Sequence, residues 1–200
     1  MKRSCLFAFV LLIGVASAGH AQHGGGVSVA LPAVTAPQEA RQFDFLLGHW
    51  EVELTPKVNG LVAMIHGAPH LVGTWKAWRA FDGFGLDDEL RIVDGSGNPV
   101  SLSHVSRIYD KAAGLWRISG LDVYRARFSA ATAVWKDGQM QVNGSGIGSD
   151  GKPYLSRTLF HDIGPNAFSM QQDRSVDDGA TWDEAALRIT ARRLAASAPR

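Results

Sequence analysis

The sequence predicts an all-β fold, an antiparallel up-and-down β-barrel of about ten strands. Apolar and polar residues alternate with a period of two along most of the chain. The 22 glycines, against only 8 prolines, gather largely at positions suited to tight turns. The connections between alternating segments are too short for crossover helices, which excludes a parallel α/β sheet. Closure into a barrel removes exposed sheet edges, and a two-sheet sandwich is the alternative.

The first 21 residues have the pattern of a secretory signal peptide. Lys2 and Arg3 precede an apolar run over 5–15, and small residues follow it. The run is too short for a mature membrane anchor. Cleavage would remove Cys5, the only cysteine, and change the net charge from +1 to −1. We therefore expect a periplasmic or secreted protein without disulfides or a membrane anchor, and with no basic surface for nucleic acid.

The remaining chain divides into three parts. Residues 22–38 are rich in glycine, alanine and proline and predict a flexible leader. Residues 39–194 predict the barrel domain, which a short helix over 39–47 could introduce, and residues 195–200 predict a disordered tail. No pattern indicates the oligomeric state.

The ten predicted strands each show the two-residue alternation and end at turn residues. Asp-Gly pairs and asparagines in the connectors supply the positive-φ positions of hairpin turns. The strands are expected at 49–54, 71–81, 86–93, 100–109, 115–119, 128–135, 139–145, 154–163, 168–176 and 182–193.

Three segments carry a recognisable pattern: FDFLLGHWEV at 43–52, RIYD with GLW at 107–116, and SVDDGATW at 175–182 preceded by Gln172. In this order they resemble a bacterial family of domains of unknown function with a calycin-like fold, related to the lipocalins. The resemblance spans Phe43 to about Arg193. It implies a closed antiparallel barrel and no established activity. We expect Gly48 to allow a close chain approach at the barrel base and Trp50 to plug that end.

The terminal segment also resembles the Asp-box hairpin of sialidase-like propellers. In such hairpins, aspartate and serine side chains brace the turn and a tryptophan packs beneath it. A propeller would repeat the motif at a fixed period, whereas this chain contains it once. The pattern therefore predicts a braced hairpin rather than a sialidase.

No motif assigns a catalytic residue, a metal site or a cofactor. The chain lacks a nucleophile elbow, a P-loop, a dinucleotide-binding glycine set and a zinc-protease helix. His66 and His70 lack an evident third ligand, so we expect no metal there. Some calycin-like barrels bind haem through a histidine, which leaves haem as an alternative, with His49, His104 or His161 as its axial ligand.

Candidate ligand-binding residues are polar side chains placed within apolar strands. A buried arginine needs a partner, which could be Glu89 or an anionic ligand. Three tryptophans could form the apolar walls of a pocket. The candidates are Trp75, Trp78, Glu89, His104, Arg107, Trp116, Arg157 and Gln172, with Arg174 as a further strand arginine.

These observations favour a barrel that binds a small-molecule partner. We expect this ligand to be mostly apolar, and it could carry a carboxylate. One alternative is a cofactor-free enzyme that uses the cavity, with Glu89 or a histidine as general base. Another is a structural domain whose lumen is filled by side chains. The volume and lining of the lumen distinguish these hypotheses.

Overall fold

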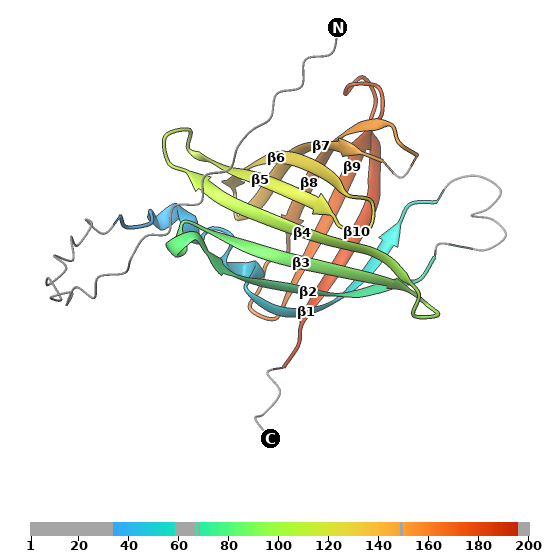
Figure 1. The fold of residues 1–200 in the computed structure, drawn as a ribbon, viewed down its shortest axis with the longest axis horizontal. Helices are drawn as coiled ribbons and strands as arrows, with labels where there is room; N and C mark the ends of the chain where they lie inside the picture. The colour runs from blue at the N-terminus through green and yellow to red at the C-terminus, as the bar shows by residue number, and fades with distance from the viewer. Residues whose placement is uncertain (1–33, 59–66, 68, 149, 196–200) are drawn as a thin grey trace, which may run out of the picture. The chain divides into compact units, whose positions relative to one another are not determined.

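A computed structural model describes residues 34–58, 67, 69–148 and 150–195. Within these residues, ten strands form one closed barrel, and each strand pairs with its neighbours in sequence while β10 pairs with β1 (Figure 1). Every neighbouring pair is antiparallel. The predicted barrel is therefore confirmed, and the sandwich alternative is wrong.

Each predicted strand is present, with ends that move by a few residues. The largest extension is in β5, which continues three residues beyond the predicted end. The strands are β1 (Gly48–Pro56), β2 (Leu71–Ala80), β3 (Gly85–Asp94), β4 (Pro99–Asp110), β5 (Leu115–Asp122), β6 (Arg127–Lys136), β7 (Gln139–Ile147), β8 (Pro153–His161), β9 (Ala167–Ser175) and β10 (Asp183–Arg193).

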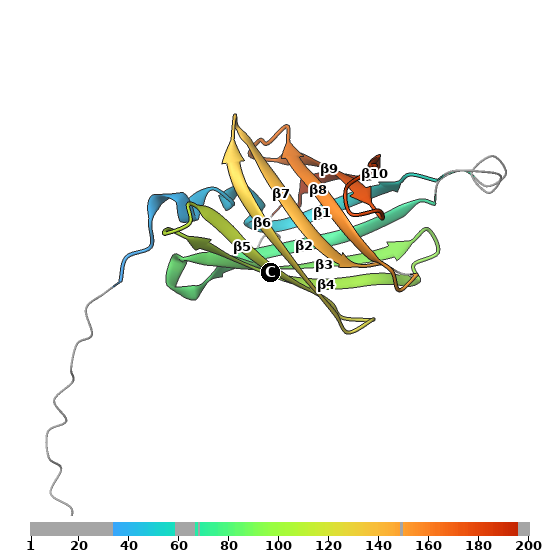
Figure 2. The same ribbon diagram turned by 90° about the horizontal axis from the view of Figure 1, so that it is seen from above.

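Two short 3-10 helices precede β1 and lie at one end of the barrel (Figures 1 and 2). They are η1 (Gln38–Arg41) and η2 (Asp44–Leu46), and a third, η3 (Phe81–Gly83), joins β2 to β3. Phe43, between η1 and η2, is fully buried. Its ring meets Trp116 edge-on, with 4.9 Å between ring centroids. The segment that introduces the barrel therefore also closes one end of it.

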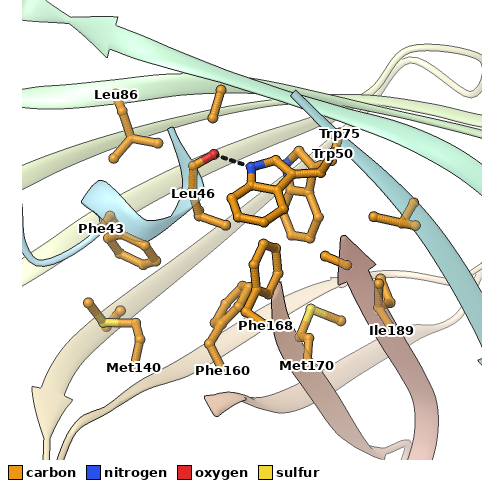
Figure 3. Close-up of a cluster of buried hydrophobic side chains, with 14 of the residues drawn as sticks. Phe43, Leu46, Trp50, Trp75, Leu86, Met140, Phe160, Phe168, Met170 and Ile189 are labelled. Carbon is orange, nitrogen blue, oxygen red and sulfur yellow. Dashed lines mark hydrogen bonds between the residues drawn. The ribbon is translucent and has the colours of Figure 1, made fainter. Parts of the chain in front are cut away.

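Tryptophan side chains fix this closing segment by hydrogen bonds to it. Trp50 Nε1 donates to the Leu46 carbonyl oxygen at 2.7 Å (Figure 3). Trp116 Nε1 donates to Gln42 Oε1 at 3.0 Å. Trp50 is completely buried, which matches the role expected for it at the barrel base.

Gly48 adopts a φ of 111°, a conformation that favours glycine. A Cβ there would lie 2.5 Å from Arg193 Nη1, so a larger residue would displace that guanidinium. The Arg193 guanidinium lies 4.0 Å from the centre of the Trp50 ring. The first and last strands are thus joined by side chains as well as by their backbone ladder.

Side chains of the closed end form the hydrophobic core, which Figure 3 shows as rings and aliphatic groups converging from opposite walls. We call this part of the lumen the closed half. It is built from Phe43, Leu46, Trp50, Trp116, Met140, Phe160 and Phe168, all of them buried. Phe168 contacts both Trp50 and Phe160 at centroid distances of 4.9 and 6.1 Å. Burial of this aromatic surface stabilises the domain.

The hairpin between β9 and β10 is braced by side chains, as predicted. Asp177 accepts hydrogen bonds from the Thr181 backbone and hydroxyl, at 2.9 and 2.6 Å, and from the Ser175 hydroxyl at 2.7 Å. Ser175 Oγ accepts from the Gly179 amide at 2.8 Å. The bonds from Thr181, and then that from Ser175, lower the pKa of Asp177 to about 2.

Several predictions fall outside the described residues. These are the signal peptide, most of the leader, His66 and the tail beyond residue 195. Within the part of the chain that the structure describes, no helix is both long and apolar enough to span a membrane.

Candidate functional site

The lumen contains a cavity of about 220 Å³ next to the closed half. Its walls carry small side chains on strands β5 to β8, where the closed half carries aromatic rings. We call this part of the lumen the hollow half, and its small-residue wall consists of Gly120, Ser129, Ala131, Gly144 and Ser156.

The two glycines of this wall have little room for a side chain, because side chains of the adjacent strands lie close to them. A Cβ on Gly120 would lie 2.6 Å from Ser129 Oγ. A Cβ on Gly144 would lie 3.0 Å from the Ala131 Cβ and 3.2 Å from Ser156 Oγ. The cavity therefore arises from a set of small residues that face one another across the strand ladder.

A buried ion pair lies where the hollow half meets the closed half. Arg107 on β4 pairs through Nη1 with Asp88 Oδ2 on β3, and both side chains are almost completely inaccessible. Asp88 Oδ1 accepts a hydrogen bond from Trp75 Nε1 at 2.7 Å. The Arg107 guanidinium also lies 5.2 Å from the centre of the Phe43 ring. The pair thus connects the cavity to the segment that closes the barrel.

One nitrogen of the Arg107 guanidinium, the buried Nε, has no hydrogen-bond partner among the described residues. Burial lowers the pKa of Arg107 to about 9, and the negative charge of Asp87 opposes this shift. The guanidinium is therefore still charged at neutral pH. Arg107 lines the cavity, but its Nε atom is itself inaccessible from it.

The rest of the lining combines apolar side chains with neutral polar ones. Gln172 Nε2 donates to Thr158 Oγ1 at 3.2 Å. Tyr154 lines the cavity and stacks with Arg174, whose guanidinium lies 4.1 Å from the ring centre. The apolar lining comprises Leu90, Val105, Ile118, Val142, Phe160 and Met170, and the neutral polar lining also includes Ser103 and Ser156.

Three of the candidates line this cavity and one lies beside it. Trp75, Arg107 and Gln172 contribute to the cavity wall. Trp116 is fully buried in the closed half, where it packs on Phe43 and Tyr109.

The other four candidates lie on the outer face of the barrel. Trp78 and His104 pack together there, with ring centroids 5.9 Å apart. Glu89 pairs with Arg91 on the same strand at 3.1 Å, and Arg157 stacks over Trp182 at 3.7 Å. Their strand neighbours Ala77, Asp88, Val105 and Ser156 take the inward positions.

Of the two partners considered for a buried arginine, Glu89 or an anionic ligand, Glu89 is wrong for Arg107, because Asp88 pairs with it instead. Side chains alternate between the faces of a strand, so adjacent residues cannot both face the lumen. The signal was present in the sequence, because Asp88 shares its parity with Leu86 and Leu90, which face inward. The small-residue wall could not be predicted from the sequence in this way, because its residues come together only through the register of four strands.

The histidines considered as haem ligands do not face the cavity. His49 lies next to the inward Trp50 and is exposed. His104 is near Asp87, with 4.0 Å between Nε2 and Oδ1. His161 Nδ1 contacts Asp162 Oδ2 at 2.8 Å. The described lining of the cavity thus contains no imidazole.

Comparison with known proteins adds little to this geometry. No family model matches the chain, and no curated protein is significantly similar to it. A solved structure described as "Structure of EF1p2_mFAP2b bound to DFHBI" is 13% identical, with 78% of this chain and 98% of that chain covered and a TM-score of 0.39. The resemblance to a calycin-like family rests on the sequence motifs and stays a prediction, while the barrel itself is established by the strand pairing.

Proposed function

We propose that the hollow half of the lumen binds a small, uncharged and largely apolar molecule that carries a hydrogen-bond acceptor. The observation that carries this proposal is the lumenal cavity of about 220 Å³, whose lining combines apolar side chains with neutral hydrogen-bonding groups such as the Ser156 and Thr158 hydroxyls and the Gln172 amide. These neutral groups can donate hydrogen bonds to an acceptor on a ligand.

The ion pair favours a neutral ligand over a carboxylate. Asp88 already compensates the charge of Arg107, and both groups are inaccessible to water. A carboxylate placed here would add a second anion beside Asp88 in a medium of low dielectric, which is unfavourable. A carbonyl or amide oxygen can accept from neutral donors of the lining, such as the Ser156 hydroxyl, without that cost. The carboxylate expected from the sequence is therefore the less favoured ligand group.

The size of the cavity sets the size of the ligand. An apolar protein cavity of about 150 Å³ can hold one benzene molecule. The 220 Å³ found here leaves room for a ring of that size with a small polar substituent. Leu90, Val105 and Ile118 supply apolar contacts, and the serine hydroxyls of the hollow half offer further hydrogen bonds.

The ionisable groups of the cavity support binding rather than proton transfer. A general base needs a free lone pair directed at the substrate. Asp88 uses one oxygen to accept from Trp75 and the other to pair with Arg107. Glu89, the sequence-based candidate for the base, lies on the outer face. Residues that bind and orient a ligand are thus better supported than residues that would transform it.

Calorimetric titration with benzamide and benzoate tests the proposal, because the two differ mainly in charge. We expect benzamide to bind and benzoate to bind at least about tenfold more weakly, as an uncompensated buried charge predicts. Tighter binding of benzoate would overturn the assignment of a neutral ligand. Binding of neither compound would overturn the lumen as a site for ring-sized molecules.

We also propose that the protein acts after export, in the periplasm or outside the cell. The support is the sequence of residues 1–21, with its basic start, apolar run and small-residue end. Fractionation of a bacterial host followed by N-terminal sequencing checks this. A mature chain that starts near Gln22 in the exported fraction is the expected result. A full-length chain that stays in the cytoplasm would contradict it.

A further inference from the structure

The outer face of the barrel carries a second hollow, separate from the lumen. It is shallow and largely open to solvent, with a volume of about 670 Å³ over strands β5 to β8. We call it the outer trough. Its lining includes the exposed side chains of Arg117, Thr132, Asn143, Ser145 and Arg157 and the half-buried side chains of Leu155 and Trp182.

Strand register places four of these side chains in one row across the sheet. Arg117 on β5 is opposite Thr132 on β6, which is opposite Asn143 on β7, which is opposite Arg157 on β8. Three strand spacings separate the two arginines, or about 14 Å between their backbones. The trough therefore has a positive charge at each end and neutral hydrogen-bonding groups between them.

The floor of the trough is low because its residues are small. Ala130 and Ser145 occupy the neighbouring row, and Gly144 contributes only backbone. The larger side chains of Leu155 and Trp182 form one wall. An elongated molecule could thus lie on the sheet surface and reach both arginines.

Arg157 is held in place for such a contact. Its guanidinium stacks 3.7 Å from the centre of the Trp182 ring, and Trp182 Nε1 donates to the Gly179 carbonyl at 3.1 Å. The nearest carboxylate in register is Asp173, which instead accepts from Gln171 Nε2 and the Ala185 amide. Stacking fixes the guanidinium plane while leaving its donors free for an anion.

Arg117, unlike Arg157, already has a carboxylate partner among the described residues, and an incoming anion can replace that partner. It donates through Nε to Asp110 Oδ2 at 2.7 Å, but its side chain is 65% exposed. Exposed ion pairs of this kind contribute little free energy, so an incoming anion can share or replace Asp110. No carboxylate belongs to the described lining of the trough itself.

We propose that the outer trough binds a short acidic oligosaccharide. Carboxylates spaced along the sugar chain would meet Arg117 and Arg157, and sugar hydroxyls would meet Thr132, Asn143 and Ser145. A uniformly charged polyanion is a poorer match, because the middle of the row is uncharged. This inference is independent of the lumen, since the two sites use opposite faces of the same wall.

Calorimetry with the whole purified protein tests the proposal with three probes. These are a short oligogalacturonate, a malto-oligosaccharide of the same length, and galacturonate monomer. We expect the oligogalacturonate to bind and both other probes to bind at least about tenfold more weakly. Equal binding of the neutral oligosaccharide would show that the site does not recognise the carboxylates, and it would contradict the proposal. Equal binding of the monomer would reduce the site to a small-anion site, and absence of binding would overturn the proposal.

Arginine variants locate the binding. Arg157→Gln should weaken oligogalacturonate binding about tenfold, and Arg117→Gln by a smaller factor because Asp110 already shares that charge. Arg188→Gln is the matched control, since Arg188 is exposed on β10 outside the trough. An equal loss in all three variants would indicate nonspecific attraction to positive charge and would contradict a built site.

Discussion

The closed and hollow halves of the lumen belong to one barrel, yet they differ in what their inward positions carry. In the closed half, Trp50, Trp116 and Phe160 fill the lumen and bury each other. In the hollow half, Gly120 and Gly144 face the same lumen with no side chain at all. The strand pairing continues unchanged from one half to the other. Side-chain volume, not strand arrangement, therefore decides whether this barrel is packed or open.

The ion pair of Arg107 and Asp88 lies at the boundary between the two halves, and it has different neighbours on each side. Towards the closed half, Arg107 packs against Phe43. Towards the hollow half, Arg107 belongs to the lining of the cavity. A stability role and a binding role thus meet in one residue, and mutations can separate them.

The largest expected effect is on the closed half. Phe43→Ala should lower the free energy of unfolding by about 4 kcal/mol, because it empties a fully buried aromatic position against Trp116. Urea unfolding measures the change. Phe128→Ala is the matched control, since Phe128 is 73% exposed and its loss should cost less than about 0.5 kcal/mol. Similar effects of the two substitutions would contradict the assignment of Phe43 to the core.

A somewhat smaller loss is expected at the boundary. Asp88→Asn should destabilise the protein by roughly 3 kcal/mol, because it leaves the buried charge of Arg107 uncompensated. Adding Arg107→Met should restore most of that loss, since the double variant removes both charges. Urea unfolding of the single and double variants gives the comparison. A double variant less stable than the single one would show that the pair is not the source of the effect.

In the hollow half, we expect a substitution to affect binding more than stability. Ser156→Leu places a larger side chain in existing space, so the free energy of unfolding should change by no more than about 1 kcal/mol. Benzamide affinity should fall at least about tenfold as the space is filled. Thr190→Leu, an exposed position on β10, is the control that should leave binding unchanged. Unchanged affinity in Ser156→Leu would place the ligand elsewhere.

The smallest effect concerns the braced hairpin, outside both halves. The pKa of Asp177 is lowered to about 2 in the folded protein, against an ordinary value of 3.8. The stability it contributes is therefore complete above pH 3.8 and is lost as the pH falls towards 2. Asp177→Asn should flatten this part of the curve of Tm against pH, whereas Asp178→Asn should not. Identical curves for the wild type and Asp177→Asn would contradict the proposed bracing.

The features that the sequence predicted well are local ones. Ten strands and the hairpin of Ser175 and Asp177 follow from alternation and turn residues within short segments. Trp50 at the barrel base was also predictable, because a single motif brings glycine and tryptophan together there.

The features that were missed depend on partners far apart in the chain. Glu89 and Arg157 were candidates because they interrupt apolar strands, but the outer face also carries apolar residues, which obscures the parity. Asp88 was recoverable from its alternation with Leu86 and Leu90. The hollow half was not, since Gly120, Ala131 and Gly144 form a wall only once strand register is known.

The most direct test of the account is backbone-amide NMR during a titration with benzamide. We predict the largest shifts at Gly120, Gly144 and Ser156 and at Arg107, with the amides of the closed half, such as that of Phe168, changing much less. Saturable shifts confined to the hollow half would support a ligand site in the lumen. Shifts confined to the outer face, or no saturable shifts, would contradict it.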